Sequence, residues 1–322
     1  MNDLVTPLSR NGSSARCVVR SATIREFAHA VRNFHPAHLR ADAAHRLGFS
    51  GLVAPPTFPA VFLGHVHREL LDTACTGAEG PRILHADHVL DLARPLVAGD
   101  HLDCQVHVES SRYFSDYEVL TIRSALVDQD GRTRQTGTTT LLGRVRTASA
   151  TSAVEEIFAG RGSLETAPLP AIKRMPCTTV DFDSLGVGDE LPAQLLEVSA
   201  AELAEYAAVT GLSSAEAPGM YELGLATGYL TDWLGDPAAI ARLRTQVAPG
   251  VHGLRVRPGQ RVRLALRGRV TGLDRRHRTA TLAVDLRCEG RRLFGYAAAE
   301  ARFARDPSPA TPPAAPPRAA DR

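Results

Sequence analysis

The sequence predicts an α+β fold made of two similar halves, each with an antiparallel sheet that wraps one apolar helix. Near the end of each half, long stretches alternate Val, Leu and Thr with polar residues, the period-2 pattern of half-buried antiparallel strands. Glycine turns centred on Gly99 and Gly259, 160 residues apart in a chain of 322, introduce these stretches. A repeat at that distance, with the elements in the same order on both sides, indicates an internal duplication.

The first half opens with a short extended stretch and an amphipathic helix over residues 24–33. An apolar run of helix length at 58–71 is the candidate for the wrapped helix. Strands are predicted at 101–111, 118–128 and 135–145, and the Asp130-Gly131 pair between the last two is a hairpin signal.

The second half repeats this order. A helix is predicted at 200–210 and a wrapped apolar helix at 221–234. Strands follow at 261–272, 279–288 and 293–303, with a Glu289-Gly290 turn before the last. We expect the two halves to pair through their sheets into one continuous antiparallel sheet.

Two segments differ from these halves in composition. Residues 147–176 mix Ser, Thr, Ala, Gly and Pro without periodicity, and 306–322 are nearly all Pro, Ala, Arg and Asp. Such compositions bury too little apolar surface to order themselves. The expected organisation is therefore a first half over 1–146, a linker over 147–176, a second half over 177–305 and a disordered tail over 306–322.

Composition excludes several classes of protein. The chain is 44% hydrophobic and 22% charged, and its 37 basic and 35 acidic side chains give a net charge of +2. Such a balance provides no basic surface for nucleic acid or an anionic membrane. No apolar run approaches the roughly 20 residues of a membrane span, and the polar N-terminus lacks a secretory signal. We expect a cytoplasmic protein whose five widely spaced cysteines are reduced.

Several stretches carry a resemblance to a known family. In the first half they are 47–58 (Leu-Gly-Phe-Ser-Gly-Leu-Val-Ala-Pro-Pro-Thr-Phe), 94–100 (Arg-Pro-Leu-Val-Ala-Gly-Asp) and 138–144 (Thr-Thr-Thr-Leu-Leu-Gly-Arg). In the second half they are 187–189 (Val-Gly-Asp), 206–211 (Tyr-Ala-Ala-Val-Thr-Gly), 228–237 (Gly-Tyr-Leu-Thr-Asp-Trp-Leu-Gly-Asp-Pro) and 294–295 (Phe-Gly). The chain resembles the MaoC-like (3R)-hydroxyacyl-ACP dehydratases and hydratases of actinobacteria, with an A-type first half and a B-type second half. This resemblance implies a double-hotdog fold.

The family resemblance also implies a chemistry. An Asp-x-Asn-Pro-x-His loop, normally in the B-type half, performs the acid and base work, and a glycine N–H at the start of the apolar helix polarises the thioester carbonyl. Here the B-like half lacks the loop, because the chain reads Leu-Ser-Ser-Ala-Glu-Ala-Pro over 212–218 and runs directly into Gly219. Leu212 cannot ionise. Glu216 is the nearest carboxylate, and the alternative to a catalytic role for it is an ordinary acid in a surface loop. Gly219 keeps the position of the N–H donor.

The A-like half carries a degenerate version of the motif. Asn33 replaces the Asp, His35 replaces the Asn, and the Pro and the final His are retained, the latter as His38. Pro55 stands where the N–H donor belongs and has no N–H, so Thr57 supplies the next N–H and a hydroxyl. The candidate catalytic residues are therefore His38, which titrates near neutral pH when exposed, and Asn33. The alternative for His38 is a surface or loop histidine inherited from the fold.

The chain contains no Gly-rich phosphate loop, and its histidines lack carboxylates at metal-ligand spacing, so no cofactor and no metal are expected. Aromatic residues near the two helix starts could line a substrate tunnel, although most are equally well explained as core. The candidate substrate-binding residues are His35, Thr57, Phe58, Gly219, Met220, Tyr221 and Trp233.

Three functions remain open. The first is an enzyme of natural-product biosynthesis that promotes cyclisation of a long acyl or polyketide substrate by confinement, because positioning alone can lower a barrier without acid or base groups. The second is a conventional hydroxyacyl-ACP or hydroxyacyl-CoA dehydratase or hydratase, a lyase that the damaged motif opposes. The third is a non-catalytic acyl-chain binding protein. An acyl carrier protein is the partner that the resemblance implies, and a homodimer is left open.

Overall fold

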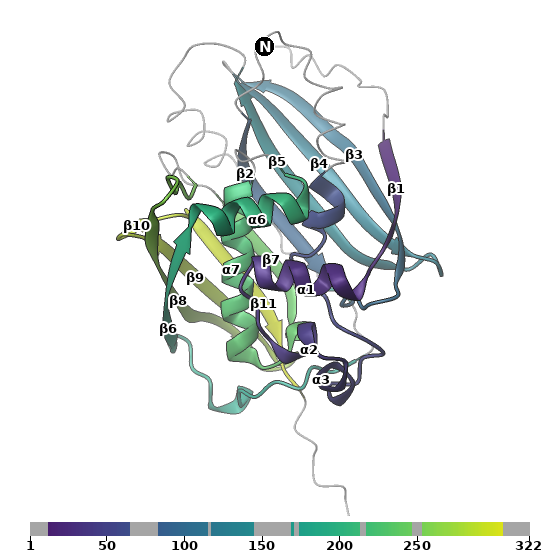
Figure 1. Cartoon of the computed structure of the whole chain (residues 1–322). Coiled ribbons are helices and arrows are strands. Elements are labelled where there is room, and N and C mark those ends of the chain that lie inside the picture. The colour runs from purple at the N-terminus through teal and green to yellow at the C-terminus, as the bar shows by residue number, and fades with distance from the viewer. Residues whose placement is uncertain are drawn as a thin grey trace, which may run out of the picture.

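The computed structural model describes residues 12–64, 83–114, 117–144, 169–170, 174–212, 217–246 and 253–304. The first half contains five strands in this part of the chain, with three short helices and a further helical stretch over 60–64 between the first strand and the second (Figure 1). The strands are β1 (Gly12–Val18), β2 (Ile83–Leu92), β3 (His101–Phe114), β4 (Tyr117–Asp128) and β5 (Thr133–Arg144). The helices are α1 (Ser21–Ala30), α2 (Pro36–Leu39) and α3 (Ala41–Arg46).

The second half repeats this plan with two longer helices, α6 (Ala200–Thr210) and α7 (Ala217–Leu234). Its strands are β6 (Glu190–Ser199), β7 (Ile240–Gln246), β8 (Arg261–Asp274), β9 (Thr279–Cys288), the two-residue β10 (Arg291–Arg292) and β11 (Tyr296–Arg302). Short 3₁₀ turns, η1 (Phe182–Ser184) and η2 (Pro237–Ala239), precede β6 and β7.

The strands of both halves form one antiparallel sheet in the order β1-β3-β4-β5-β2-β7-β11-β9-β8-β6. The halves meet where β2 pairs with β7, with Leu90 opposite Leu243. Two ion pairs reinforce this junction, Arg242 with Asp91 at 2.6 Å and Arg244 with Asp87 at 3.4 Å. The predicted continuous sheet and α+β double-hotdog fold are therefore confirmed.

Most predicted strands and helices match the structure to within a few residues. The helix predicted at 24–33 is shifted, because α1 spans Ser21–Ala30 and Arg32 has a positive φ that ends the helix before Asn33. The first apolar helix also differs. Consecutive turns occupy 56–59, and residues 60–64 are helical, so the helix begins later than residue 58. The backbone here makes tighter i→i−3 bonds, such as that from the Phe58 N–H to the Pro55 carbonyl oxygen at 2.9 Å, before the Leu63 N–H makes an i→i−4 bond to the Pro59 carbonyl oxygen at 2.9 Å. Residues 65–71 of the predicted helix lie outside the described residues.

Helix α7 is the wrapped helix of the second half. Every residue from 221 to 231 is buried, which is the pattern of a helix surrounded by protein on all sides. Helices α1 and α6 pack against each other beside it (Figure 1), with the rings of Phe27 and Tyr206 5.9 Å apart. A capping box begins α6, in which Ser199 and Glu202 bond each other's backbone N–H.

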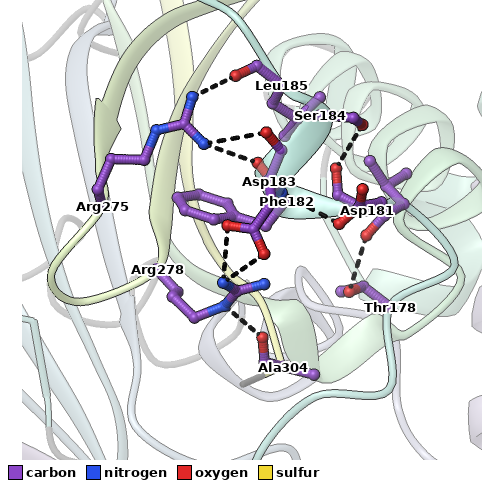
Figure 2. A network of polar contacts seen from close by, with 10 residues as sticks. Thr178, Asp181, Phe182, Asp183, Ser184, Leu185, Arg275, Arg278 and Ala304 are labelled. Atoms are coloured by element: carbon purple, nitrogen blue, oxygen red, sulfur yellow. Dashed lines mark hydrogen bonds and ion pairs between the residues drawn. The ribbon is translucent and has the colours of Figure 1, made fainter. Parts of the chain in front are cut away.

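Two arginines in the turn between β8 and β9 bind the segment around η1, at the start of the second half (Figure 2). Arg275 donates to the carbonyl oxygen of Leu185 at 2.6 Å, and Arg278 donates to both carboxylate oxygens of Asp183 at 2.8 and 2.9 Å. Both guanidinium groups lie over the ring of Phe182, at 5.3 and 4.9 Å from its centroid. These contacts fix η1 against the sheet.

Arg174 links the two halves away from the sheet. Its Nη2 donates to the buried carboxylate of Asp236 at 2.7 Å, and its Nε donates to the carbonyl oxygen of Leu47 at 2.8 Å. The guanidinium also stacks on Phe49, 4.2 Å from the ring centroid. The rest of the predicted linker and the whole predicted tail lie almost entirely outside the described residues, so the domain boundaries stay predictions. No helix in the described part of the chain is long and apolar enough to cross a membrane.

Candidate functional site

The residue between the end of α1 and the degenerate motif has a strained backbone conformation. Arg32 has a φ of +52°, in the left-handed region that glycine adopts without cost, and the equivalent position after α6 is Gly211 with a φ of +66°. The side chain of Arg32 reaches the second half, where its Nε donates a hydrogen bond to Glu202 at 2.8 Å. Since Glu202 also caps α6, the loop after α1 is tied to the first turn of the other half's helix.

Asn33 is buried completely at the junction of the halves. Its Oδ1 accepts from the backbone N–H of His35 at 3.5 Å, whereas Nδ2 has no hydrogen-bond partner among the described residues. A Cβ placed on Gly228 of α7 would lie 3.4 Å from the Cβ of Asn33. An amide, which can donate a hydrogen bond but cannot ionise, thus stands at the position of the motif's carboxylate and packs against α7.

His35 fastens the loop to the far end of α7. Its Nδ1 accepts from the Ala37 N–H at 3.3 Å, so the ring proton is on Nε2, which donates to the carbonyl oxygen of Gly235 at 3.0 Å. Burial lowers the pKa of His35, although the Gly235 carbonyl and the nearby carboxylates of Asp236 and Asp232 partly oppose this. His35 is therefore a neutral group that positions the loop.

His38 is completely buried. Its Nδ1 lies 2.6 Å from the carbonyl oxygen of Val53, which can only accept, so Nδ1 carries the proton. Desolvation lowers the pKa of His38 to about 3. Its Nε2 is a bare lone pair without a partner among the described residues. Its side chain is wholly buried, which rules out a surface histidine and leaves a histidine inherited from the fold as the alternative to a catalytic role.

The start of the first apolar helix lies next to α7. Thr57 is buried, and its hydroxyl has no partner in the described part of the chain. A Cβ on Gly224 would lie 3.7 Å from this hydroxyl oxygen and 2.6 Å from Cγ1 of Val31. Phe58 is wholly buried between the rings of Phe27 and Phe62, at 5.5 and 5.3 Å, in the hydrophobic core.

Gly219, Met220 and Tyr221 lie in the first turns of α7. Gly219 is exposed, a Cβ added to it would meet no heavy atom of the described chain within 4 Å, and its N–H is one of the four that lack an intrahelical acceptor. Met220 is half-buried. Tyr221 is buried with its ring 5.4 Å from that of Tyr206, and neither hydroxyl has a partner among the described residues.

Trp233 lies at the other end of α7 and packs against Phe303, with ring centroids 6.5 Å apart. Twelve residues of helix separate it from Tyr221, which corresponds to roughly 18 Å along the axis. The structure therefore separates Trp233 from the predicted residues in the first turns of α7, and places it at the end of α7 to which His35 is bonded through Gly235.

Three unpaired polar groups follow one side of α7. Tyr221, Gly224 and Gly228 share a helix face because they are three and four residues apart. Tyr221 begins that face, and Thr57 and Asn33 lie against its two glycines. We call the Tyr221 hydroxyl, the Thr57 hydroxyl and the Asn33 amide the donor row. Leaving such groups unpaired costs about 1–3 kcal/mol each, so they are suited to hydrogen-bonding the oxygens of a ligand.

The second half mirrors this arrangement without its polar groups. Leu212 follows α6 as Asn33 follows α1, and a Cβ on Gly64 would lie 3.0 Å from the Leu212 side chain and 2.9 Å from the carbonyl oxygen of Thr210. An apolar residue thus occupies the acid position of this half. Glu216 lies outside the described residues.

Sequence reasoning missed Glu222, a buried carboxyl one residue after Tyr221. Its Oε1 accepts from the backbone N–H of Leu254, and desolvation raises its pKa to about 8. The signal was an acid within the apolar run 221–234, which contains only one other charged residue, Asp232. Tyr206 was also missed as a site residue, although it opens the 206–211 stretch that carries the family resemblance. In the described residues no three His, Cys, Asp or Glu side chains converge as metal ligands would.

Comparison with known proteins gives matches that cover about one half of the chain and matches that cover nearly all of it. A family model described as "FAS1-like, dehydratase domain region" matches residues 10–134. A UPF0336 protein of Clavibacter michiganensis subsp. michiganensis is 35% identical over 132 residues, which are 41% of this chain and 89% of that protein. A UPF0336 protein of Mycobacterium tuberculosis is 34% identical over 126 residues, which are 39% of this chain and 80% of that protein. These relatives correspond in length to one half.

Two solved structures span both halves. A MaoC-like dehydratase is 26% identical with a TM-score of 0.76 and covers 91% of this chain and 98% of its own. A Mycobacterium tuberculosis protein described as having a double hotdog fold is 15% identical with a TM-score of 0.64, covering 91% of this chain and 96% of its own. The second likeness concerns the fold alone.

Proposed function

Because the chain belongs to the MaoC-like, FAS1-like dehydratase family of hotdog proteins, we propose that it binds a long acyl or polyketide chain between its halves and promotes cyclisation of that chain by confinement. The finer parts of this proposal are the cyclisation, the polyketide substrate and delivery of that substrate on an acyl carrier protein. Each rests on the chemistry of the described residues and on what the family resemblance implies.

The observation that carries the proposal is the state of His38 and Asn33. A dehydratase must remove a C2 proton and protonate the leaving hydroxyl, so it needs one group that accepts and one that donates. The only ring proton of His38 is donated to Val53, and its pKa of about 3 keeps it neutral at physiological pH. Asn33 cannot ionise. The described motif therefore has no general acid that could protonate a leaving hydroxyl.

The donor row supports a substrate that carries several oxygens. Tyr221, Thr57 and Asn33 present O–H and N–H groups along about two turns of α7, and the carbonyl oxygens of a polyketide are matching acceptors. Holding two reacting ends together can contribute roughly 7–11 kcal/mol without acid or base catalysis. A cycloaddition exchanges two π bonds for two carbon–carbon bonds within one molecule, so it needs neither proton donor nor cofactor.

A second candidate is hydration or dehydration of an acyl thioester. The observation in its favour is the unpaired Nε2 of His38, a lone pair that could accept a proton from a substrate or water. Acyl-chain binding without catalysis is the third alternative, and it differs from both in showing no turnover.

The test begins with the molecule that co-purifies with the full chain, identified by native mass spectrometry. A linear thioester bearing a diene and an enone is then used as the probe, and ring closure is followed as an isomer of unchanged mass with altered ultraviolet absorbance. Thr57→Val and Tyr221→Phe should slow ring closure at least about tenfold while leaving stability unchanged or higher, because each removes an unpaired buried hydroxyl.

Thr227→Val is the matched control on the same helix, since the Thr227 hydroxyl already donates to the carbonyl oxygen of Gly224 at 2.9 Å. His38→Asn, which keeps a donor for Val53, should retain ring closure. Hydration of crotonyl-CoA at a rate typical of hydratases, abolished in His38→Asn, would instead identify acid–base catalysis and overturn the confinement proposal.

A further inference from the structure

Two cysteines face each other across the outermost pair of strands in the first half. β1 pairs with β3 so that Cys17 is opposite Leu102 and Cys104 is opposite Ala15. Cys17 and Cys104 are therefore diagonal neighbours on one face of the sheet, where Leu102 is buried. Their sulfur atoms lie 3.1 Å apart, closer than any ordinary packing contact between two thiols.

Both thiols are free, and they differ in accessibility. Cys104 is buried, whereas Cys17 is partly exposed. The Cys104 thiol donates a hydrogen bond to Cys17, which lowers the pKa of Cys17 and raises that of Cys104. A disulfide needs a sulfur–sulfur distance of about 2.05 Å, so the two sulfur atoms must approach each other by about 1 Å for the bond to form.

We propose that Cys17 and Cys104 are an oxidation site at which a peroxide closes a cross-strand disulfide. The Cys17 thiolate attacks one oxygen of hydrogen peroxide, the O–O bond breaks, hydroxide leaves, and Cys17 becomes a sulfenic acid. The Cys104 sulfur then attacks the Cys17 sulfur, the S–O bond breaks, and the thiol proton leaves with hydroxide as water. In sum, two thiols lose two protons and two electrons, and one peroxide becomes two waters.

The position of the pair determines what the disulfide does. β1 is the end strand of the sheet, and its neighbour there is β3. After β1 the chain passes through Val19, whose N–H donates to the carbonyl oxygen of Asp100 at 2.9 Å, and enters α1. A disulfide would fasten this edge strand covalently and so anchor the start of the helix that leads to Asn33. The inference is independent of the proposed function.

The test uses the full chain treated with hydrogen peroxide, followed by alkylation of free thiols and peptide mass spectrometry without reduction. We expect the peptides containing Cys17 and Cys104 to appear joined, with two hydrogens fewer than their sum, and the melting temperature to rise by about 5 °C or more until reductant is added. The exposed Cys177 is the internal control, since it should be oxidised without joining Cys104.

Cys17→Ser and Cys104→Ser should each abolish both the joined peptide and the thermal shift, and Cys288→Ser should abolish neither. The proposal is overturned if Cys17 and Cys104 remain fully alkylatable at a peroxide concentration that has oxidised Cys177. It is also overturned if the two serine variants keep the reversible thermal shift, because the stabilisation would then come from another bond.

Discussion

Asn33 of the first half packs directly against Gly228 of the second: a Cβ at position 228 would lie 3.4 Å from the Cβ of Asn33 and 3.5 Å from its Cα. Leu212 stands in the same relation to Gly64 on the other side of the pseudo-dyad. The residue that follows α1 and the residue that follows α6 are thus each seated on the apolar helix of the opposite half. Neither position carries an ionisable group, because one is an amide and the other an aliphatic side chain.

The glycines of α7 should differ in their tolerance of a side chain. At Gly224 a Cβ would lie 2.6 Å from Cγ1 of Val31, so Gly224→Ala should lose about 1–2 kcal/mol through overpacking, despite the better helix propensity of alanine. Gly228→Ala, with its closest contact at 3.4 Å, should be neutral or stabilising. Urea unfolding of the two variants measures the difference, and equal effects at both positions would contradict this account of the packing.

His38 should make the protein less stable as the pH falls. Its folded pKa of about 3 lies below the ordinary 6.5, so below pH 6.5 the unfolded chain binds a proton that the folded chain does not. The loss amounts to roughly 1.4 kcal/mol per pH unit down to the folded pKa. His38→Asn keeps a donor for the Val53 carbonyl and cannot titrate, so its unfolding free energy should fall less between pH 7 and 4.5. Parallel curves for the two proteins would show that His38 is not desolvated in solution.

Glu222 should make the protein less stable as the pH rises. Its pKa is raised from 4.5 to about 8 by burial, so the folded chain holds a proton that the unfolded chain releases, and stability is lost as the pH rises from 4.5 towards 8. Glu222→Gln retains an acceptor for Leu254 and should be more stable than the parent by roughly 2–4 kcal/mol at pH 7.5, with little difference at pH 4.5. Thermal unfolding at both pH values tests this, with Glu205→Gln, at an exposed site, as the control.

Arg174→Lys should be destabilising although it conserves the charge. Lysine keeps a cation near the buried Asp236 but cannot also donate to Leu47 and stack on Phe49. We expect a loss of about 1–3 kcal/mol in urea unfolding. Arg40→Lys, at an exposed pair with Asp42, should change stability by less than about 0.5 kcal/mol. An equal effect at both sites would remove Arg174 as a link between the halves.

The sequence by itself determined the architecture. Alternating strands and two apolar helices are local patterns, and their repetition between Gly99 and Gly259 required the same fold twice. It also determined the chemical deficit, since Asn33, Leu212 and Pro55 lack a carboxylate or an N–H in any conformation.

Tertiary structure alone decided what surrounds the retained groups. The burial of His38, the reach of Arg32 to Glu202 across 170 residues and the approach of Cys17 to Cys104 depend on contacts between distant segments. A pKa or an unpaired hydroxyl is set by neighbours in space, and those neighbours are not encoded in local spacing. For that reason the burial of Glu222 and its raised pKa emerged only from the tertiary structure.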